Sequence, residues 1–263
     1  MYNESLRLQK EIILCEDGTN TLYSREFNEP YHSTRDGALQ ESLQKHVKPS
    51  FKLKSDKEKL TILDICFGLG YNTFATLYHI KKNKLKTKVH ILSPEFDEGL
   101  VRSLDTFEYP SEFENLKPVI EAIAQNLHYE DEQFKIDVLI GDARQSIPKL
   151  LAPRSSLLPD KIDVVYQDAF SPKVNPLLWT KEWFADIRAL CRDDAILTTY
   201  STAAATRMGL YENGFELHSY DAPNTRRSLI ASPQKIETLA WIDMVLKKQR
   251  NPDAKSLKDM DFQ

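Results

Sequence analysis

The chain has 263 residues, of which 41% are hydrophobic, and carries a formal net charge of −4 at pH 7. This apolar content is enough for one sizeable α/β core or two small domains. The acidic balance gives no general support to nucleic-acid binding, which would need a local basic patch. The three cysteines, Cys15, Cys66 and Cys191, are far apart and odd in number, so neither a disulfide framework nor a zinc site is expected. Because no window has a signal core or the length of a membrane span, we expect a cytoplasmic protein without a membrane partner.

The first 55 residues have a pattern of their own. Residues 11–24, EIILCEDGTNTLYS, predict two short strands around a turn. Residues 36–47, DGALQESLQKHV, predict a helix because apolar residues recur at four-residue spacing. The polar, lysine-rich residues 48–59 predict a loop. We therefore expect an N-terminal strand and helix extension over residues 1–55.

Strands then alternate with helices in the rest of the chain. Strands are expected at residues 60–67, 88–95, 136–142, 161–168 and 195–201. Helices are expected at 71–83, across 97–127, at 176–191 and at 203–212, and a hairpin is expected from 215–220 and 227–232. This alternation predicts an α/β, Rossmann-like fold with a mostly parallel seven-stranded sheet and a terminal antiparallel hairpin. The main domain is expected over residues 56–250, followed by a loose polar tail at 251–263.

Four consecutive strands are followed by an acid or by an acid and a glycine loop. The stretches are LDICFGLG, LSPE, IGDA and YQDA. In an open α/β sheet, ligands bind outside the carboxyl ends of the strands, so these side chains are expected to converge. A single strand-end acid is as often a helix cap or a turn residue. The repetition in register is what favours a binding site.

The strand ends also predict the kind of ligand. Gly68 and Gly70 allow a close backbone approach after the first strand. Glu95 stands 25 residues after Gly70, where a carboxylate can accept both hydroxyls of a ribose. Asp142, followed by Ala143, places an acid where an adenine amino group would lie. Together these residues predict a site for S-adenosylmethionine.

NAD is the rival ligand for such a loop. The dinucleotide fingerprint requires a third glycine, and this chain has Thr73 in that position. Cys66 stands where a methyltransferase loop often has its first glycine, and its Cβ narrows the loop. These two residues favour S-adenosylmethionine over NAD and mark the loop as unusual.

The longer motifs resemble the methyltransferase domain of the MnmC family, the tRNA 5-methylaminomethyl-2-thiouridine biosynthesis proteins, in a stand-alone form. The resemblance covers residues 15–232. It rests on EDGTNTLYS, EPYHSTRDGALQES, DICFGLGYN, YQDAFSPKVNPLLWTKEWF, TTYSTAAATRMGLYENGF and RRSLIAS. The run QDAFSPKVNPLLW is the most specific of these. The chain departs from the family at Cys66, where a glycine is usual, and at APNTRR, which replaces a glycine-rich turn before a basic pair.

The resemblance implies a class I methyltransferase fold and a tRNA substrate. The implied reaction is methylation of the amine of 5-aminomethyl(-2-thio)uridine at the wobble position of the anticodon region, which gives 5-methylaminomethyl(-2-thio)uridine. S-adenosyl-L-methionine is the implied donor. No metal and no flavin are expected in this chain, so a separate oxidoreductase would supply the aminomethyl substrate.

Asp168, at the end of the fourth strand, is expected to orient the acceptor amine, accept its proton or position the methyl donor. The alternative is a helix cap. Phe170 is expected to stack on the uracil, and Lys173 to hold a phosphate or a base edge beside the reacting groups. The expected RNA contacts are Lys173, Arg207, Arg226 and Arg227.

Other conspicuous side chains are expected to be structural. An isolated histidine such as His32 is more often structural than catalytic. Trp179, Trp183 and Phe184 recur at helical spacing, which favours the core over a base-stacking platform.

Two alternatives from other classes remain open. An aminopropyltransferase of the spermidine synthase type uses a related sheet and a decarboxylated form of the same cofactor, but its glycine-rich GGGDG loop is missing from this sequence. A non-catalytic RNA-binding protein on a methyltransferase scaffold is the second alternative. The retained Gly68, Gly70, Glu95 and Asp142 argue against it.

Overall fold

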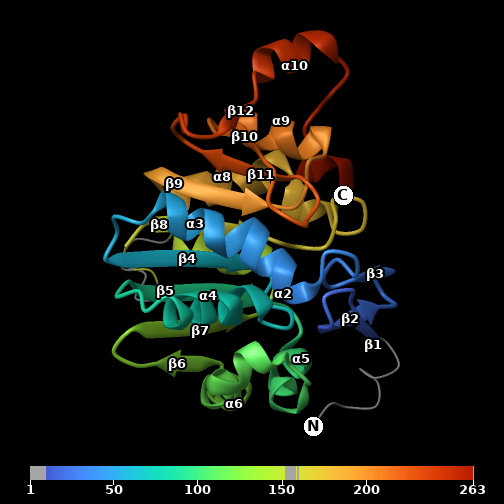
Figure 1. Ribbon diagram of the computed structural model, residues 1–263. Coiled ribbons are helices and arrows are strands. Elements are labelled where there is room, and N and C mark those ends of the chain that lie inside the picture. Colours follow the sequence, from blue (N-terminus) through green and yellow to red (C-terminus); the bar gives the residue numbers. More distant parts are fainter. Residues whose placement is uncertain (1–9, 152–157, 159, 263) are drawn as a thin grey trace.

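Two sheets organise the described residues, 10–151, 158 and 160–262, in this computed structural model (Figure 1). The large sheet has the strand order β12-β10-β11-β9-β8-β4-β5-β7-β6. Its parallel strands are β4 (Lys59–Ile65), β5 (Lys88–Glu95), β7 (Phe134–Ile140), β8 (Ile162–Gln167) and β9 (Cys191–Thr199). The antiparallel hairpin is β10 (Glu216–Tyr220) and β11 (Ser228–Ser232). The predicted seven-stranded Rossmann-like sheet is thus confirmed, and the short antiparallel edge strands β6 (His128–Glu130) and β12 (Ala240–Trp241) extend it.

Helices cover both faces of the large sheet, so the central parallel strands are buried on both sides. This explains why their sequences are nearly continuous apolar runs. One buried apolar cluster joins the sheet to α4 (Tyr71–Lys82), η3 (Ser111–Leu116) and α6 (Lys117–Asn126), with α5 (Glu98–Arg102) and η2 (Leu104–Thr106) beside them. The other joins the opposite face to α7 (Ala143–Leu150), α8 (Lys181–Leu190) and α9 (Ala204–Glu212). Trp179, Trp183 and Phe184 are fully buried in this second cluster, as predicted. None of the described helices is long and apolar enough to cross a membrane.

The N-terminal region contributes a small sheet and a helical segment (Figure 1). The sheet consists of β1 (Lys10–Leu14), β2 (Asn20–Ser24) and β3 (Glu29–Pro30), so the predicted pair of strands is confirmed. The helical segment runs through α2 (Ala38–Glu41), η1 (Ser42–Val47) and α3 (Lys48–Leu53). Its apolar side chains belong to the same core cluster as α4 and α6. The boundary predicted between residues 55 and 56 falls in the turn that follows α3.

The loop predicted from residue 48 is wrong over Lys48–Leu53, which forms α3. Pro49 lacks an N–H and would interrupt an α-helix. The preceding turn, η1, is a π-helix in which the N–H of Lys48 bonds to the carbonyl of Leu43, five residues back. This wider turn leads into Pro49 at the start of α3, and Phe51 is buried in the core.

Two further expectations need correction: the helix expected at residues 176–191 begins only at Lys181, and the tail expected to be loose over residues 251–263 is held by specific contacts. Residues 176–191 form a 3₁₀ turn, η4 (Pro176–Trp179), followed by α8, because the Thr180 hydroxyl accepts a hydrogen bond from Trp183 N and caps the new helix. The tail predicted to be loose is fastened to this cap: Lys181 N donates to Leu257 O at 2.8 Å and Thr180 Oγ1 donates to Asp259 at 2.6 Å. The helix α10 (Met244–Arg250) precedes the tail, and the 3₁₀ turn η5 (Asp259–Phe262) lies within it. The polar composition of the tail gives no sign of these few specific contacts.

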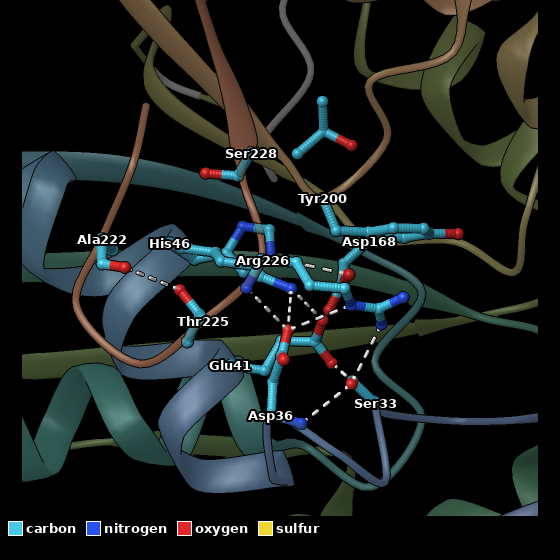
Figure 2. A network of polar contacts seen from close by, with 12 residues as sticks. Ser33, Asp36, Glu41, His46, Asp168, Tyr200, Ala222, Thr225, Arg226 and Ser228 are labelled. Carbon is cyan, nitrogen blue, oxygen red and sulfur yellow. Dashed lines mark hydrogen bonds and ion pairs between the residues drawn. The ribbon is translucent and has the colours of Figure 1, made fainter. Parts of the chain in front are cut away.

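A buried ion-pair cluster fixes the helical segment against the turn between β10 and β11 (Figure 2). Lys45 Nζ lies 2.7 Å from both Asp36 Oδ2 and Glu41 Oε1, and all three side chains are at most 7% exposed. From the turn, Arg226 N donates to Asp36 Oδ2 at 3.3 Å. Burial alone would raise the pKa of the Asp36 carboxyl, but Lys45 and Arg226 outweigh burial and lower it. Charges taken out of water are tolerated here because each one has a partner.

Removing Lys45 is therefore expected to be costly. Lys45→Met should lower the free energy of unfolding by about 3–5 kcal/mol, because it leaves two buried carboxylates without their cation. Urea unfolding measures the loss. Lys117→Met is the matched control, since the ion pair of Lys117 with Glu114 is 63% and 65% exposed. It should change the free energy by no more than about 1 kcal/mol. A Lys45→Met variant as stable as the wild type would show that the cluster does not depend on this cation.

Candidate functional site

A cavity of about 550 Å³ lies at the carboxyl ends of the parallel strands. Its walls are the segments that follow β4, β5, β7 and β8, so the convergence predicted for the strand-end acids is observed. The N-terminal sheet and the residues after it supply a further wall with Lys10, Phe27, Tyr31 and His32. This volume lies within the range of about 300–1,000 Å³ that is usual for small-molecule sites.

Glu95 ties two walls of the cavity together. Its carboxylate accepts hydrogen bonds from Gly68 N and Asp97 N, each at 2.8 Å, and the residue is 9% exposed. Burial raises the pKa of the Glu95 carboxyl, against the effect of these backbone donors. Asp97 in turn pairs with Lys10 at 2.5 Å, which fastens β1 to this side of the cavity.

The glycine loop divides into a cavity-lining half and a packing half. Cys66 and Gly68 line the cavity, and both have positive φ, 67° and 53°. Gly70 instead packs away from the cavity, where an added Cβ would lie 2.6 Å from Phe74 and 2.8 Å from Phe67. Gly70 is thus required for tight packing, and its predicted direct contact with a ligand is not supported. Cys66 adopts the conformation that favours glycine at a cost of order 1 kcal/mol.

Asp142 and Ala143 line the cavity as predicted. Asp142 Oδ1 accepts from Arg144 N at 2.9 Å and so caps α7. Phe96, which follows Glu95, is 80% exposed although it lines the same cavity. An exposed ring beside two acids provides an apolar surface for a flat heterocycle.

Asp168 lies at the inner end of the cavity and is only 10% exposed. Its Oδ2 accepts from Asn72 Nδ2 at 2.9 Å, and its Oδ1 lies 3.5 Å from His46 Nε2 (Figure 2). Burial alone would raise the pKa of the Asp168 carboxyl, but the neighbouring His46 imidazole and the Asn72 amide outweigh burial and hold that pKa below its usual value. Asp168 is therefore an ionised carboxylate at neutral pH. It contributes no cap to η4 or to α8, whose cap is Thr180.

The segment after Asp168 is held by hydrogen bonds to its backbone. Trp179 Nε1 donates to Phe170 O at 2.7 Å, and Tyr200 OH donates to Ala169 O at 2.9 Å. Glu29 of β3 accepts from the Ser171 hydroxyl at 2.5 Å and from Ser171 N at 3.1 Å. These bonds explain why a turn rich in proline and asparagine keeps Asp168 in one place.

Three aromatic rings gather beside Asp168. The Phe170 ring stacks on Phe27 with centroids 4.5 Å apart and meets Tyr31 edge-on at 4.9 Å. All three residues line the cavity. One face of Phe170 is therefore already covered by Phe27, and stacking of its other face on a base stays a prediction.

None of the four predicted cations is among the residues that line the cavity. Lys173 is exposed and stands outside the cavity lining, so the structure places it with surface cations and does not support its predicted catalytic role. Arg207 donates to Thr202 O at 2.7 Å, and Arg227 pairs with Asp221 at 2.8 Å. Arg226 and Arg227 remain 63% and 66% exposed.

His32 has the structural role expected of it, although it lines the cavity. Its Nδ1 lies 2.9 Å from Thr21 Oγ1, and its ring meets Tyr71 edge-on. Burial lowers the pKa of the His32 imidazole, which keeps it neutral at neutral pH. His32 thus joins the N-terminal sheet to the start of α4.

The charges of the cavity fit a cationic ligand. Among the described residues that line it are six carboxylates and two cations, Lys10 and Arg144. Both cations are already paired, Lys10 with Asp97 and Arg144 with Asp259. S-adenosylmethionine carries a sulfonium, an ammonium, a ribose and an adenine. The acidic lining, Glu95 and the exposed Phe96 ring suit these groups.

Sequence patterns alone do not reveal several residues of this site. Asn72, Phe27 and Phe96 are brought to the cavity by tertiary packing, and His46, which is not among the lining residues, is brought to Asp168. His46 and Asn72 lie inside predicted helices and look like ordinary helix residues there. Phe96 carries a weak signal, because it follows the acid at the end of a predicted strand. His46 and Asp168 are far apart in the sequence, and no local pattern joins them.

Comparison with known proteins identifies relatives over most of the chain. A family model described as S-adenosyl-L-methionine-dependent methyltransferase matches residues 111–235. The uncharacterized protein MJ0670 of Methanocaldococcus jannaschii is 31% identical over 229 residues, which cover 86% of this chain and 60% of that protein. The tRNA 5-methylaminomethyl-2-thiouridine biosynthesis bifunctional protein MnmC of Aeromonas hydrophila is 27% identical over 229 residues, which cover 80% of this chain and 33% of that protein. The chain therefore spans about a third of the length of this MnmC relative.

A solved structure extends the similarity to the whole fold. The crystal structure of MnmC2 from Aquifex aeolicus aligns with 96% of this chain and 79% of its own, with a TM-score of 0.79 and 29% sequence identity. The match includes the regions on either side of the segment covered by the family model. The fold, the strand-end cavity and these matches together identify the chain as an S-adenosylmethionine-dependent methyltransferase and a methyltransferase-domain protein of the MnmC family.

Proposed function

We propose that this chain methylates the amine of 5-aminomethyl(-2-thio)uridine at the wobble position of tRNA. The observation that carries the proposal is the buried, ionised Asp168 beside three aromatic rings at the inner end of an acidic cavity. A carboxylate suits an amine acceptor, because it can accept an N–H hydrogen bond and stabilise positive charge on nitrogen. The names of the MnmC relatives support a tRNA substrate.

Some residues of the chain would bind the methyl donor, and others would orient the acceptor amine. Bound S-adenosylmethionine would supply an electrophilic methyl group. Glu95 would accept hydrogen bonds from the ribose while it holds the glycine loop through Gly68 N. Asp168 would orient the amine for in-line attack through a hydrogen bond. Because the pKa of Asp168 is low, this carboxylate is suited to orient the amine and to pass a proton on, and it is a poor place to store one.

The RNA would approach over an exposed rim of cations. The cations proposed for this rim are Lys173 in the turn after β8, the partly exposed Arg207 on α9, and Arg226 and Arg227 in the β10–β11 turn. Phosphate contacts from such a rim would supply affinity that the acidic whole-chain charge does not. We also propose that the protein acts in the cytoplasm and that an oxidoreductase supplies its aminomethyl substrate.

Mass spectrometry of nucleosides tests the proposal directly. Undermodified tRNA carrying 5-aminomethyl(-2-thio)uridine would be incubated with the protein and S-adenosylmethionine, then digested. The expected product is 5-methylaminomethyl(-2-thio)uridine. An aminopropyl product formed only with the decarboxylated donor would support the spermidine synthase alternative. Tight tRNA binding with no new nucleoside would support a non-catalytic RNA-binding protein.

The role of Glu95 can be measured by calorimetry. Glu95→Ala should weaken S-adenosylmethionine binding by about 1.5–3 kcal/mol, the range for a hydrogen bond to a charged group. Glu121→Ala, on the exposed side of α6, is the control and should bind the donor normally. If Glu95→Ala binds the donor with unchanged affinity, Glu95 has no part in donor binding.

Asp168→Asn tests the group at the reacting end. The replacement is nearly isosteric, so the fold should persist, and the single-turnover methylation rate should fall on the order of 10²-fold or more. The wild-type rate should rise with pH as the acceptor amine loses its proton. Asp168 itself is already ionised there, because its pKa is depressed. The pH dependence should change in the variant.

A defect of Asp168→Asn that saturating S-adenosylmethionine restores would show that Asp168 mainly positions the donor. A folded variant with wild-type rate and donor affinity would exclude both roles.

The cation rim should make tRNA binding sensitive to salt. Replacing Arg226 and Arg227 by Ala should weaken tRNA binding and reduce the slope of log affinity against log salt by roughly 0.7–0.9 for each phosphate that is no longer neutralised. Donor affinity should be unchanged. Replacing Lys81 and Lys82 by Ala removes the same charge from the far end of α4 and should leave the slope intact. Equal slopes for the arginine variant and the wild type would place the RNA elsewhere.

A further inference from the structure

His46 and Asp168 face one another with no hydrogen bond between them. The His46 side chain is fully buried, and its Nε2 lies 3.5 Å from Asp168 Oδ1. Among the residues that the structure describes, Nε2 has no hydrogen-bond partner. A buried polar atom without a partner is rare and costly, and it often marks a functional group.

The partners of the other ring nitrogen indicate the tautomer. His46 Nδ1 lies 2.8 Å from Thr198 Oγ1, and that hydroxyl donates to Val165 O at 3.4 Å. A hydroxyl has one proton, so Thr198 accepts from Nδ1–H when it donates to Val165. In the neutral form of the ring, Nε2 then carries a lone pair. Two acceptors, Nε2 and the Asp168 carboxylate, face each other across a gap that one added proton would bridge.

Six other titratable groups surround this pair. They are His32, Glu41, Asp64, Cys66, Tyr166 and Tyr200. Burial raises the pKa of the Cys66 thiol and of the Tyr166 and Tyr200 hydroxyls, which stay neutral. Glu41 is bonded to Lys45 and to Ser33 N. His32 is bonded to Thr21.

Asp64 is the strongest competitor for a proton, since burial raises its pKa to about 7. Its oxygens accept from Thr73 Oγ1 at 2.9 Å and from Asn72 Nδ2 at 3.3 Å. The same Asn72 amide donates to Asp168, so it stands between the two carboxylates. An amide N–H does not hand on a proton at ordinary pH, and the route from Asp168 to Asp64 is therefore closed. His46 faces the other oxygen of Asp168 directly.

We infer that His46 takes up the proton that the acceptor amine loses, with Asp168 as the bridge. This inference rests on the proposed function. The ammonium of the acceptor gives its proton to Asp168, and Asp168 passes it to His46 Nε2. The amine lone pair then forms the N–CH₃ bond as the S–CH₃ bond breaks and sulfur keeps its electron pair. The product leaves as a methylated ammonium and loses its excess proton to solvent. The His46 imidazolium returns its proton to solvent before the next turnover.

His46→Gln separates proton uptake from positioning. The glutamine amide nitrogen reaches the place of Nε2 and can donate to Asp168, but it cannot accept a proton. At neutral pH the single-turnover rate should fall on the order of 10²-fold. The rise of the rate with pH should move to higher pH, because the amine must then arrive neutral, and the two rates should converge there. Calorimetry should give wild-type affinity for S-adenosylmethionine.

His218→Gln is the matched control. His218 is equally buried but lies on β10, where its Nε2 accepts from Ile236 N. This variant should keep the wild-type pH profile. Thr198→Val provides a second test, since it removes the acceptor of Nδ1–H with little change in volume. It should displace the pH profile in the same direction as His46→Gln and by less.

Several outcomes would overturn the inference. A His46→Gln variant with the wild-type rate at every pH would show that His46 only positions Asp168, and a loss of donor affinity would show a structural role. In the double variant with Asp168→Asn, the loss should not exceed that of Asp168→Asn alone, because both residues serve one proton path. Additive losses would refute the path. Failure of the wild type to methylate aminomethyl-tRNA would instead refute the proposed function.

Discussion

The burial of one carboxylate, Asp168, constrains much of this structure. An ionised group at the end of a buried strand is tolerated only when polar partners replace the water it has lost. Here Asn72 comes from the first turn of α4 and His46 from the N-terminal helical segment. The N-terminal segment is thus part of the site, because without it one side of Asp168 would face an empty or solvated space.

The same requirement explains how the N-terminal and C-terminal parts meet. Asp36, Glu41 and Lys45 are buried together. The backbone and side chain of Arg226 reach Asp36 from the β10–β11 turn (Figure 2). A segment fixed by buried ion pairs at one position and by the apolar core along its length cannot shift without breaking both. This rigidity holds His46 opposite Asp168, and it sets the turn that carries Arg226 and Arg227 relative to the cavity.

Sequence patterns predicted the parts of the protein that depend on local order. Parallel strands place their carboxyl ends at one edge, so the order of strands and helices along the chain was enough to predict that the acids after β5, β7 and β8 meet. The continuation of the helical segment through Pro49 and the fastening of the tail to Thr180 depend on contacts between distant segments, and composition alone predicted a loop and a loose tail there. Gly70 shows the same limit within a correct motif. A glycine signature does not reveal whether the missing Cβ makes room for a ligand or, as here, for Phe67 and Phe74.

His46 shows most clearly why the acceptor side is harder to read from sequence than the donor side. Donor-side residues follow strand ends and have recognisable spacing. His46 lies within a helical segment, and only its contacts with Asp168 and Thr198 distinguish it from an ordinary helix residue. Methyl donors are alike across many enzymes, but acceptors differ in charge and protonation. An amine acceptor adds a demand that an already deprotonated acceptor does not make, namely a place for a proton. In the proposed function, that place is the His46 imidazole, which the N-terminal helical segment packs against Oδ1 of the strand-end carboxylate while the Asn72 amide bonds Oδ2.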